Sequence, residues 1–222
     1  GDWNVPITIR IPYGVVPGGA LYHSQSVEAW FCNTPGLKVV APSFPADAKG
    51  MLKSAIRDPN PVLFFEHKKA YRLVKEEVPE DDYAVPLDKA KVHREGTDIT
   101  VISYGMMLHE VLETAQKLSE EHGIEAEVVE PMSLYPLDKE TILNSVRKTG
   151  KVLIVTEANL TGSVSAEIAA VVAREAFEWL DAPVMRLGAP DTPAAPFARP
   201  MMDLFLPDAE QIEAAMLELA RY

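Results

Sequence analysis

The later part of the chain alternates short apolar runs with longer amphipathic segments, and this alternation constrains the fold more than any other feature. The apolar runs are about five residues long, and the segments between them repeat their apolar residues at helical spacing. Strands that alternate with helices build βαβ units, which give a mostly parallel sheet. The strands are expected at Ile99–Ser103, Glu125–Val129, Lys151–Thr156 and Val184–Leu187, and the helices at Met106–Glu121, Lys139–Lys148, Ser163–Leu180 and Ala209–Tyr222.

The chain before residue 75 alternates in the same way, with shorter elements. Ser24 or Ser26 can cap a short helix, which would place His23 directly before a helix N-terminus. A second helix is expected to open at Ser43 and Pro45, because proline favours the first helical turn. The strands are expected at Val5–Ile11, Leu37–Ala41 and Val62–Phe65; the first helix groups Val27, Trp30 and Phe31 on one face, and the second runs to about Arg57 with Met51, Leu52, Ala55 and Ile56 inward.

An acidic segment separates the two regions. Lys75–Asp82 contains Pro79 and several carboxylates, a composition that is typical of a linker between domains. The sequence therefore predicts an α/β protein of two domains, residues 1–80 and 86–222, and a mostly parallel sheet in the second. Ala189–Pro200 contains four prolines and predicts an ordered surface arm rather than a helix or strand.

Charge and cysteine content exclude several classes of function. The 21 Lys and Arg residues and 33 Asp and Glu residues give a net charge of −12, which repels nucleic acids and anionic membranes. No apolar run approaches the roughly 18 residues of a membrane span. Cys32 is the single cysteine, so one chain can form neither a disulfide nor a cysteine-based zinc site, and a reducing compartment is expected. The acidic surface can steer a basic protein partner.

Self-contained catalytic motifs are missing from the sequence. It contains no GxGxxG or GxxxxGK[ST] phosphate loop, no HExxH metal motif and no GxSxG nucleophile motif. The five histidines, at positions 23, 67, 93, 109 and 122, are too far apart in sequence for a local metal cluster. We expect His93, His109 and His122 to be surface groups.

His23 is the catalytic candidate that the pattern favours. It follows a loop rich in glycine and proline and precedes a predicted helix start, where free N–H groups and the helix dipole favour an anion such as a carboxylate. Imidazole titrates near neutral pH, so His23 could donate a proton to a substrate in the transition state. The alternative is a histidine that only orders its own loop.

The turn that follows the second predicted helix offers oxygen atoms. Residues 55–60 end a helix whose last carbonyl groups lack intrahelical partners, and such carbonyls can bind a hard cation together with Asp58 or Asn60. An ordinary Asp-Pro-Asn turn explains the same residues. The pattern alone leaves both interpretations open.

Several segments spread over the whole chain form an ordered pattern: Leu21–Ser26, Pro35–Val40, Ala48–Gly50, Val62–Glu66, Tyr71–Arg72, Tyr135–Asp138 and Ala189–Asp191. In order and spacing, these segments resemble the β subunit of the E1 component of 2-oxoacid dehydrogenase complexes. Phe65–Lys68 and Glu77–Tyr83 resemble bacterial branched-chain 2-oxoacid dehydrogenases more than pyruvate dehydrogenases.

This resemblance implies the second half of a thiamine-diphosphate pyrimidine-binding-type domain, followed by a transketolase C-terminal-type domain, with the N-terminal third of the subunit lacking. The family's glutamate that binds the aminopyrimidine ring lies upstream of Gly1, and the motif that binds Mg²⁺ and the diphosphate belongs to the α subunit. His23 matches the family's active-site histidine, which is implicated in acyl transfer to the lipoyl group. The resemblance also implies a structural potassium ion, bound at Ile7, Ala55, Ile56, Asp58 and Asn60.

The activity implied is oxidative decarboxylation of a branched-chain 2-oxoacid with acyl transfer to the lipoyl group of E2. The implied partners are an E1 α subunit, in an α2β2 heterotetramer, and the subunit-binding and lipoyl domains of the E2 dihydrolipoyl acyltransferase. The alternatives are a pyruvate or acetoin dehydrogenase β subunit, or a fragment that serves only assembly and E2 docking. The expected location is the bacterial cytoplasm or the mitochondrial matrix. No targeting segment is recognised, and the start at Gly1 predicts a truncated or proteolysed chain that is inactive without the α subunit and the upstream segment.

Overall fold

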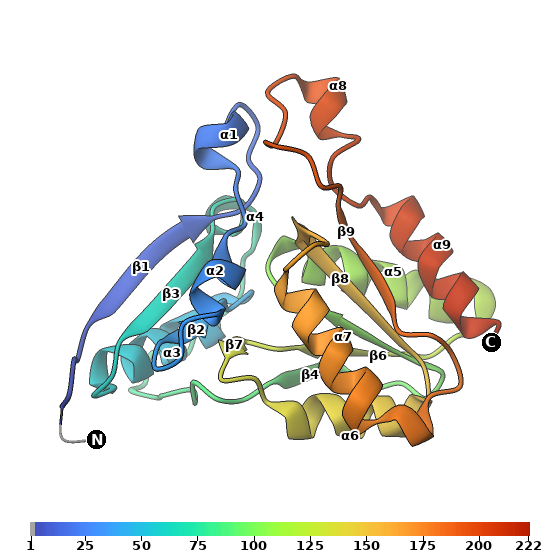
Figure 1. Ribbon diagram of the computed structural model, residues 1–222, viewed down its shortest axis with the longest axis horizontal. Coiled ribbons are helices and arrows are strands. Elements are labelled where there is room, and N and C mark those ends of the chain that lie inside the picture. Colours follow the sequence, from blue (N-terminus) through green and yellow to red (C-terminus); the bar gives the residue numbers. More distant parts are fainter. Residues whose placement is uncertain (1–2) are drawn as a thin grey trace.

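The computed structural model describes residues 3–222 and has two β-sheets that lie side by side (Figure 1). The first sheet has four strands in the order β1-β3-β2-β7, and the second has five in the order β4-β6-β5-β8-β9. The strands are β1 (Thr8–Tyr13), β2 (Lys38–Val40), β3 (Val62–His67), β4 (Lys91–Arg94), β5 (Ile99–Ser103), β6 (Ala126–Glu130), β7 (Ser133–Tyr135), β8 (Val152–Asn159) and β9 (Met185–Ala189).

Helices connect and cover these strands. The helices are α1 (Ala20–His23), α2 (Glu28–Cys32), α3 (Pro45–Arg57), α4 (Ala70–Leu73), α5 (Met106–His122), α6 (Lys139–Thr149), α7 (Val164–Glu175), α8 (Arg199–Met202) and α9 (Ala209–Ala220), with a 3₁₀ turn at Phe177–Trp179. Three of the longer ones, α3, α5 and α7, each connect two parallel strands of one sheet, as expected of βαβ units.

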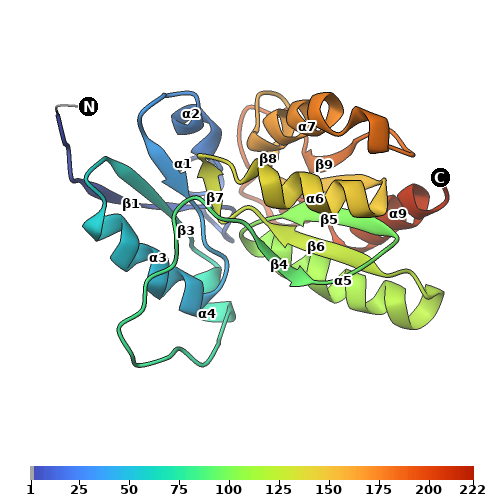
Figure 2. The same ribbon diagram turned by 90° about the horizontal axis from the view of Figure 1, so that it is seen from below.

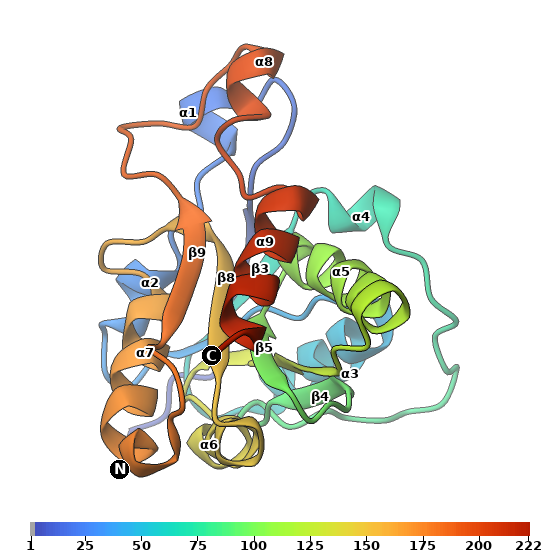
Figure 3. The same cartoon turned by 90° about the vertical axis from the view of Figure 1, so that its right-hand side faces the viewer.

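The second sheet is parallel except for one edge, which confirms the predicted mostly parallel sheet. β5 pairs in parallel with β6 and β8, and β8 with β9, whereas β4 runs antiparallel to β6. Helices α5 and α9 cover one face of this sheet, and α6 and α7 cover the other (Figures 2 and 3). The inner strands β5, β6 and β8 are therefore buried on both faces, which explains their mainly apolar sequences.

The first sheet receives a strand from the later part of the chain. β1 and β2 both pair in parallel with β3, but the other edge of β2 is occupied by β7, which runs antiparallel to it. One apolar cluster also continues across both sheets, from Leu63 and Phe65 to Ile102 and Ile154. The two halves are thus joined by a shared strand and a shared core.

Local signals at the helix ends explain why the longer predicted helices are found. α5 ends at Gly123, whose φ of +66° is the left-handed conformation predicted for a C-terminal glycine. Side chains accept backbone N–H groups at three helix starts, and these caps are Asp138 for α6, Ser163 for α7 and Asp208 for α9.

Several predicted boundaries are wrong in the first half. β1 begins at Thr8 rather than Val5, because its partner β3 begins at Val62 and Pro61 has no N–H to extend the ladder. No serine caps α2, which starts at Glu28, and Trp30 points to solvent with 75% of its surface exposed. Ile56, predicted inward on α3, is 66% exposed. The short elements β4, β7, α4 and α8 were not predicted.

The predicted linker has no helix or strand. The chain from Val74 to Ala90 crosses the outside of α3, where Ser54 donates a 2.6 Å hydrogen bond to the carbonyl of Val85. The division at residues 80–86 stays a prediction. Within residues 3–222, no helix combines the length and the apolar character that crossing a bilayer requires.

Candidate functional site

Buried polar side chains gather where the two sheets meet. His67 ends β3 and Glu157 lies near the end of β8, so each stands at the carboxyl end of a parallel strand, where α/β folds commonly place functional groups. Their side chains meet at 2.7 Å between His67 Nε2 and Glu157 Oε2, with only 2% of His67 and 6% of Glu157 exposed. This pair joins the first sheet to the second.

The hydrogen-bond network assigns the tautomer of His67. The backbone N–H of Lys69 donates to His67 Nδ1 at 3.2 Å, so the ring hydrogen resides on Nε2 and is donated to Glu157. The other carboxylate oxygen of Glu157 accepts the backbone N–H of Val15. Glu157 therefore uses both oxygens to hold two separate segments of the first half.

A second group of buried polar residues lies beside this pair. The ring of Tyr13 packs edge-on against His67, with centroids 5.1 Å apart, and its hydroxyl group has no hydrogen-bond partner among residues 3–222. Tyr104 donates a 2.6 Å hydrogen bond to Glu28, whose second oxygen is also unpartnered within these residues. Burial raises the pKa values of Tyr13 and Tyr104 well above the ordinary value of a tyrosine, and it also raises the pKa of Glu28.

A second histidine–carboxylate pair joins the halves at another point. His93 Nε2 lies 2.7 Å from Glu130 Oε2, and Glu130 Oε1 accepts the backbone N–H of Ser43 at 2.8 Å. His93 was predicted on the surface; instead its side chain is largely buried, because it stacks on Phe44 and hydrogen-bonds to Glu130. His109 is also only partly exposed and contacts the carbonyl of Ser43.

Metal-ligating atoms of Asp47, His93 and Glu130 lie within 4.8 Å of one another. Each of these groups already has a partner in the chain, since Lys91 donates to Asp47 at 2.6 Å and His93 pairs with Glu130. The cationic Lys91 opposes a metal ion at this position. The group therefore serves to hold the two halves together.

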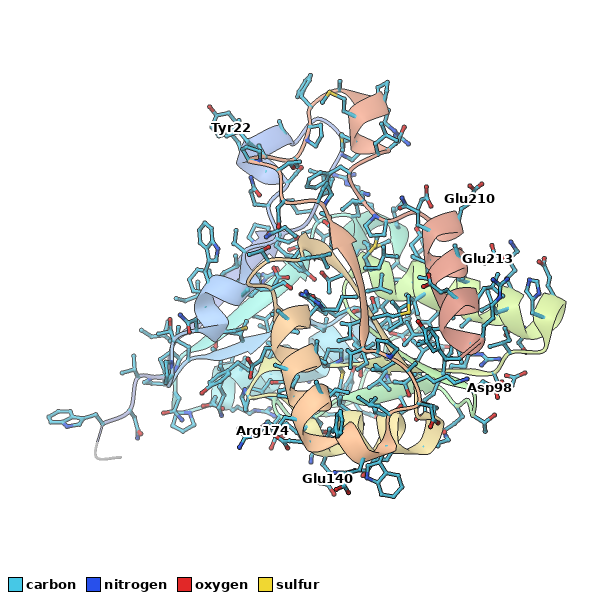
Figure 4. All side chains as sticks on the ribbon, turned by 45° about the vertical axis from the view of Figure 1, so that its right-hand side comes forward. Tyr22, Asp98, Glu140, Arg174, Glu210 and Glu213 are labelled. Atoms are coloured by element: carbon cyan, nitrogen blue, oxygen red, sulfur yellow. The ribbon has the colours of Figure 1, made fainter. Side chains whose placement is uncertain are left out.

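His23 lies elsewhere, at the end of α1 and exposed to solvent. The helix predicted after Ser24 or Ser26 is α2, which starts later, at Glu28, and Ser24 bonds to Val16 instead of capping it. His23 instead ends α1, a short helix that was not predicted. No residue between 3 and 222 hydrogen-bonds the His23 ring. α1 lies beside α8 (Figures 1 and 3), and the neighbouring Tyr22 extends into solvent (Figure 4).

A cavity of about 440 Å³ opens at the carboxyl ends of β2 and β3. Its wall includes Ser43 and His67, and Glu76 reaches across it to accept the backbone N–H of Ala46 at 2.8 Å, at the start of α3. The chain thus satisfies the positive end of this helix with its own carboxylate.

The residues predicted to bind potassium come together at one corner. Ala55, Ile56, Asp58 and Asn60 lie at the end of α3, and the pairing of Thr8 with Val62 brings Ile7 opposite this turn. The carbonyl of Ile7 accepts the N–H of Val62 and that of Ala55 accepts the N–H of Asp58. Burial raises the pKa of Asp58, but hydrogen bonds from Lys38 and Asn60 outweigh this effect and hold the pKa below its usual range.

Thiamine diphosphate, the cofactor that the resemblance implies, needs a free carboxylate for its pyrimidine ring and oxygen ligands for its magnesium ion. The buried carboxylates where the halves meet are already engaged within the chain, Glu157 and Glu130 through both oxygens and Glu28 through one. Glu157 and Glu130 therefore offer no free oxygen to the pyrimidine ring, whereas Glu28 keeps one oxygen without a partner among residues 3–222.

The sequence-based prediction assigned no role to His67, Glu157, Glu28 or Tyr104. A signal for two of them was present, because Glu157 and Tyr104 directly follow predicted strands, at the edge where a parallel sheet gathers its polar groups. Glu28 carried no such signal, since a glutamate at the start of a short helix is ordinarily exposed.

Residues 1–74 match the family Transketolase, pyrimidine binding domain, and residues 88–212 match Transketolase, C-terminal domain. Over 221 residues the chain is 56% identical to the 2-oxoisovalerate dehydrogenase subunit beta of Bacillus subtilis (strain 168), covering 100% of this chain and 67% of that protein. It is 48% identical over 219 residues to the acetoin:2,6-dichlorophenolindophenol oxidoreductase subunit beta of the same organism, covering 99% of this chain and 63% of that protein.

A solved structure described as split gene transketolase, inactive beta4 tetramer, has a similar fold. Its TM-score is 0.78 at 26% identity, over 98% of this chain and 67% of that one. The chain thus spans only about two thirds of the length of the proteins it matches. Taken together, the two domain matches and the 56% identity confirm the α/β fold and the resemblance, and the chain belongs to the transketolase-like family that includes the β subunits of 2-oxoacid dehydrogenases.

Proposed function

We propose that the chain acts as the β subunit of a 2-oxoacid dehydrogenase E1 component, in the oxidative decarboxylation of a branched-chain 2-oxoacid. The observation that carries this proposal is the 56% identity to a 2-oxoisovalerate dehydrogenase β subunit, against 48% to the acetoin-specific relative. The acyl product is transferred to the lipoyl group of an E2 dihydrolipoyl acyltransferase, in the bacterial cytoplasm or the mitochondrial matrix.

The active form is an α2β2 heterotetramer that binds thiamine diphosphate and Mg²⁺ between its α and β subunits. The full engagement of Glu157 and Glu130 within the chain supports a cofactor site built mainly from other segments. When bound, the cofactor supplies the electron sink for decarboxylation, and protein side chains orient the substrate and manage protons.

His23 is the group of this chain that acts in acyl transfer to the lipoyl domain. Its ring lies on the exposed end of α1 and makes no hydrogen bond to residues 3–222, so it is free to contact a substrate or a partner. Histidine is the most common general acid–base group in enzymes, which suits it to proton transfer in this step.

The test is to combine the chain with a cognate α subunit, thiamine diphosphate and Mg²⁺, and to measure turnover of 2-oxoisovalerate, pyruvate and acetoin with an artificial electron acceptor. We expect turnover only when the α subunit is present, with the highest kcat/KM on 2-oxoisovalerate. Faster turnover of pyruvate or acetoin would assign the chain to one of those enzymes instead.

A second candidate function is assembly without catalysis. One observation favours it: the net charge of −12 suits a basic partner. A complex with the E2 subunit-binding domain on size exclusion, from a folded chain that shows no turnover in any mixture, would support this function.

A further inference from the structure

We propose that Glu157 is a positioning residue for His23, because Glu157 and its partner His67 fasten the base of the loop that carries His23. This inference rests on the proposed role of His23 in acyl transfer. Glu157 lies 142 positions after Val15 in sequence but accepts the backbone N–H of Val15 in the fold.

The segment from Gly14 to Gln25, here called the His23 loop, closes on itself. The N–H of Gly14 donates to the carbonyl of Gln25 at 3.3 Å, and Ser24 Oγ lies 3.1 Å from the N and 3.2 Å from the O of Val16. The N–H of His23 donates to the carbonyl of Gly19 at 3.0 Å. A loop that is compact and closed in this way moves as a unit, so the position of His23 follows the position of the base.

The base of the His23 loop rests on the buried pair. Glu157 accepts the N–H of Val15 with one oxygen and the ring N–H of His67 with the other. Gly14 lies so close to the His67 ring that a Cβ atom added there would overlap Nε2. The two residues that open the loop are therefore held by one side chain from each sheet, in a region from which water is excluded.

The C-terminal arm supports the other side of this base. Val15 is buried in a small apolar cluster with Ala195, which precedes α8, and Met202, the last residue of α8. The side chain of Val15 thus contacts the arm while its N–H binds Glu157, and α1 projects beside α8 (Figures 1 and 3). Loss of the Glu157 bond would leave the loop held by apolar contact alone, which is less directional than a hydrogen bond.

Glu157→Gln is the informative change. Val15 and His67 donate to different oxygens of Glu157, so the NH2 group of a glutamine would replace one acceptor and face a donor. His67 cannot change tautomer without losing the N–H of Lys69. Glu130→Gln is the matched control: Glu130 also accepts from a backbone N–H and a histidine between the two halves, but it does not contact the His23 loop. Ser24→Ala loosens the loop without touching either pair.

The experiment uses the assembled α2β2 complex and two readouts. Hydrogen exchange is measured over residues 14–25, and the rate of acyl transfer to the lipoyl domain is divided by the rate of decarboxylation with an artificial acceptor. For Glu157→Gln we expect faster exchange and a transfer ratio reduced about ten- to hundredfold, since small misplacements of a catalytic group cost this much. Ser24→Ala should act in the same direction, and Glu130→Gln should change neither readout.

Unchanged exchange over residues 14–25 in Glu157→Gln, or an unchanged ratio despite faster exchange, overturns the inference. If Glu157→Gln does not assemble, Ser24→Ala is judged by the ratio in the same way. His23→Ala is measured in parallel: if it leaves the ratio unchanged, the proposed role of His23 fails and the positioning role fails with it. If His23→Ala lowers the ratio but Glu157→Gln does not, the proposed role of His23 stands and only the positioning role of Glu157 is rejected.

Discussion

The hydroxyl group of Tyr104 donates to Glu28 across 2.6 Å, and this bond joins the end of the second sheet to α2 at a carboxylate that is only 1% exposed. Burial is the largest influence on Glu28 and raises its pKa, while the bond from Tyr104 lowers it in part. Buried carboxylates of this kind make the free energy of unfolding depend on pH.

The first prediction concerns that pH dependence. Because the pKa of Glu28 is higher in the folded than in the unfolded state, the folded state binds more protons between the two values. Stability should therefore fall as pH rises from the unfolded value through the raised folded value, and then level off. Urea unfolding from about pH 4 to about pH 9 measures this decline, and Glu28→Gln should flatten it. An equal slope in both proteins would contradict the assignment to Glu28.

Removal of the Tyr104 hydroxyl group should make the decline of stability with pH steeper, whereas Glu28→Gln flattens it. Tyr104→Phe leaves Glu28 buried without its hydrogen bond, and we expect a loss of about 1–3 kcal/mol in the free energy of unfolding at neutral pH. The loss should shrink at low pH, where Glu28 is protonated. A loss that is independent of pH would point to packing of the ring instead.

Substitution of Gly14 and of Gly36 distinguishes the cost of backbone strain from the cost of steric overlap. Gly14 and Gly36 both have positive φ, +89° and +100°, but a Cβ atom at Gly14 would overlap the His67 ring, whereas nothing lies within 4 Å of one at Gly36. We expect Gly36→Ala to cost about 1–2 kcal/mol of strain, and Gly14→Ala to cost about 1–3 kcal/mol more through overlap. Denaturant unfolding of both variants gives the comparison. Equal losses would mean that His67 moves aside freely.

His23→Ala should reduce acyl transfer more than decarboxylation. The His23 side chain is exposed and makes no hydrogen bond to residues 3–222, so its removal is expected to leave the melting temperature within about 1–2 °C of the parent value. General acid–base groups contribute about two to four decades in rate, which sets the expected loss of transfer to the lipoyl domain. Equal loss in both assays would place His23 in an earlier step.

Potassium is expected to stabilise the corner formed by Ile7, Ala55, Ile56, Asp58 and Asn60. An ion that binds only the folded chain raises stability by mass action. We therefore predict a lower melting temperature when potassium is replaced by tetramethylammonium, measured at constant ionic strength. Asp58→Asn should reduce this difference. An unchanged melting temperature in the parent chain would show that potassium does not bind at this corner.

The second half was predicted well because its signals are local. β5, β6 and β8 are buried strands with mainly apolar sequences, and α5 ends at Gly123, as expected of a glycine after a helix. β7 was missed because Ser133–Tyr135 has no periodicity of its own and becomes a strand only by pairing with β2. Tertiary contact, rather than local preference, determines such a segment.

The buried site was harder to predict for the same reason. His67 was visible only as part of a motif, and its partner Glu157 lies 90 positions away, so no spacing rule connects them. His93 was taken for a surface residue because its neighbours are charged, although folding places it against Phe44 and Glu130. His23 was expected directly before a helix, but it ends the short helix α1, which was not predicted, and the predicted helix α2 starts at Glu28.

The pairing of β7, from the later part of the chain, with β2 in the first sheet has a consequence for protein synthesis. The first sheet cannot be completed until residues 133–135 have left the ribosome, since they cover the edge of β2. Until then the backbone of Lys38–Val40 presents an unpaired edge, which is the kind of surface that nascent chains use to aggregate. The first half therefore depends on the second during translation, and a ribosome-bound chain that stops at the linker should recruit chaperones more strongly than one that extends past Tyr135.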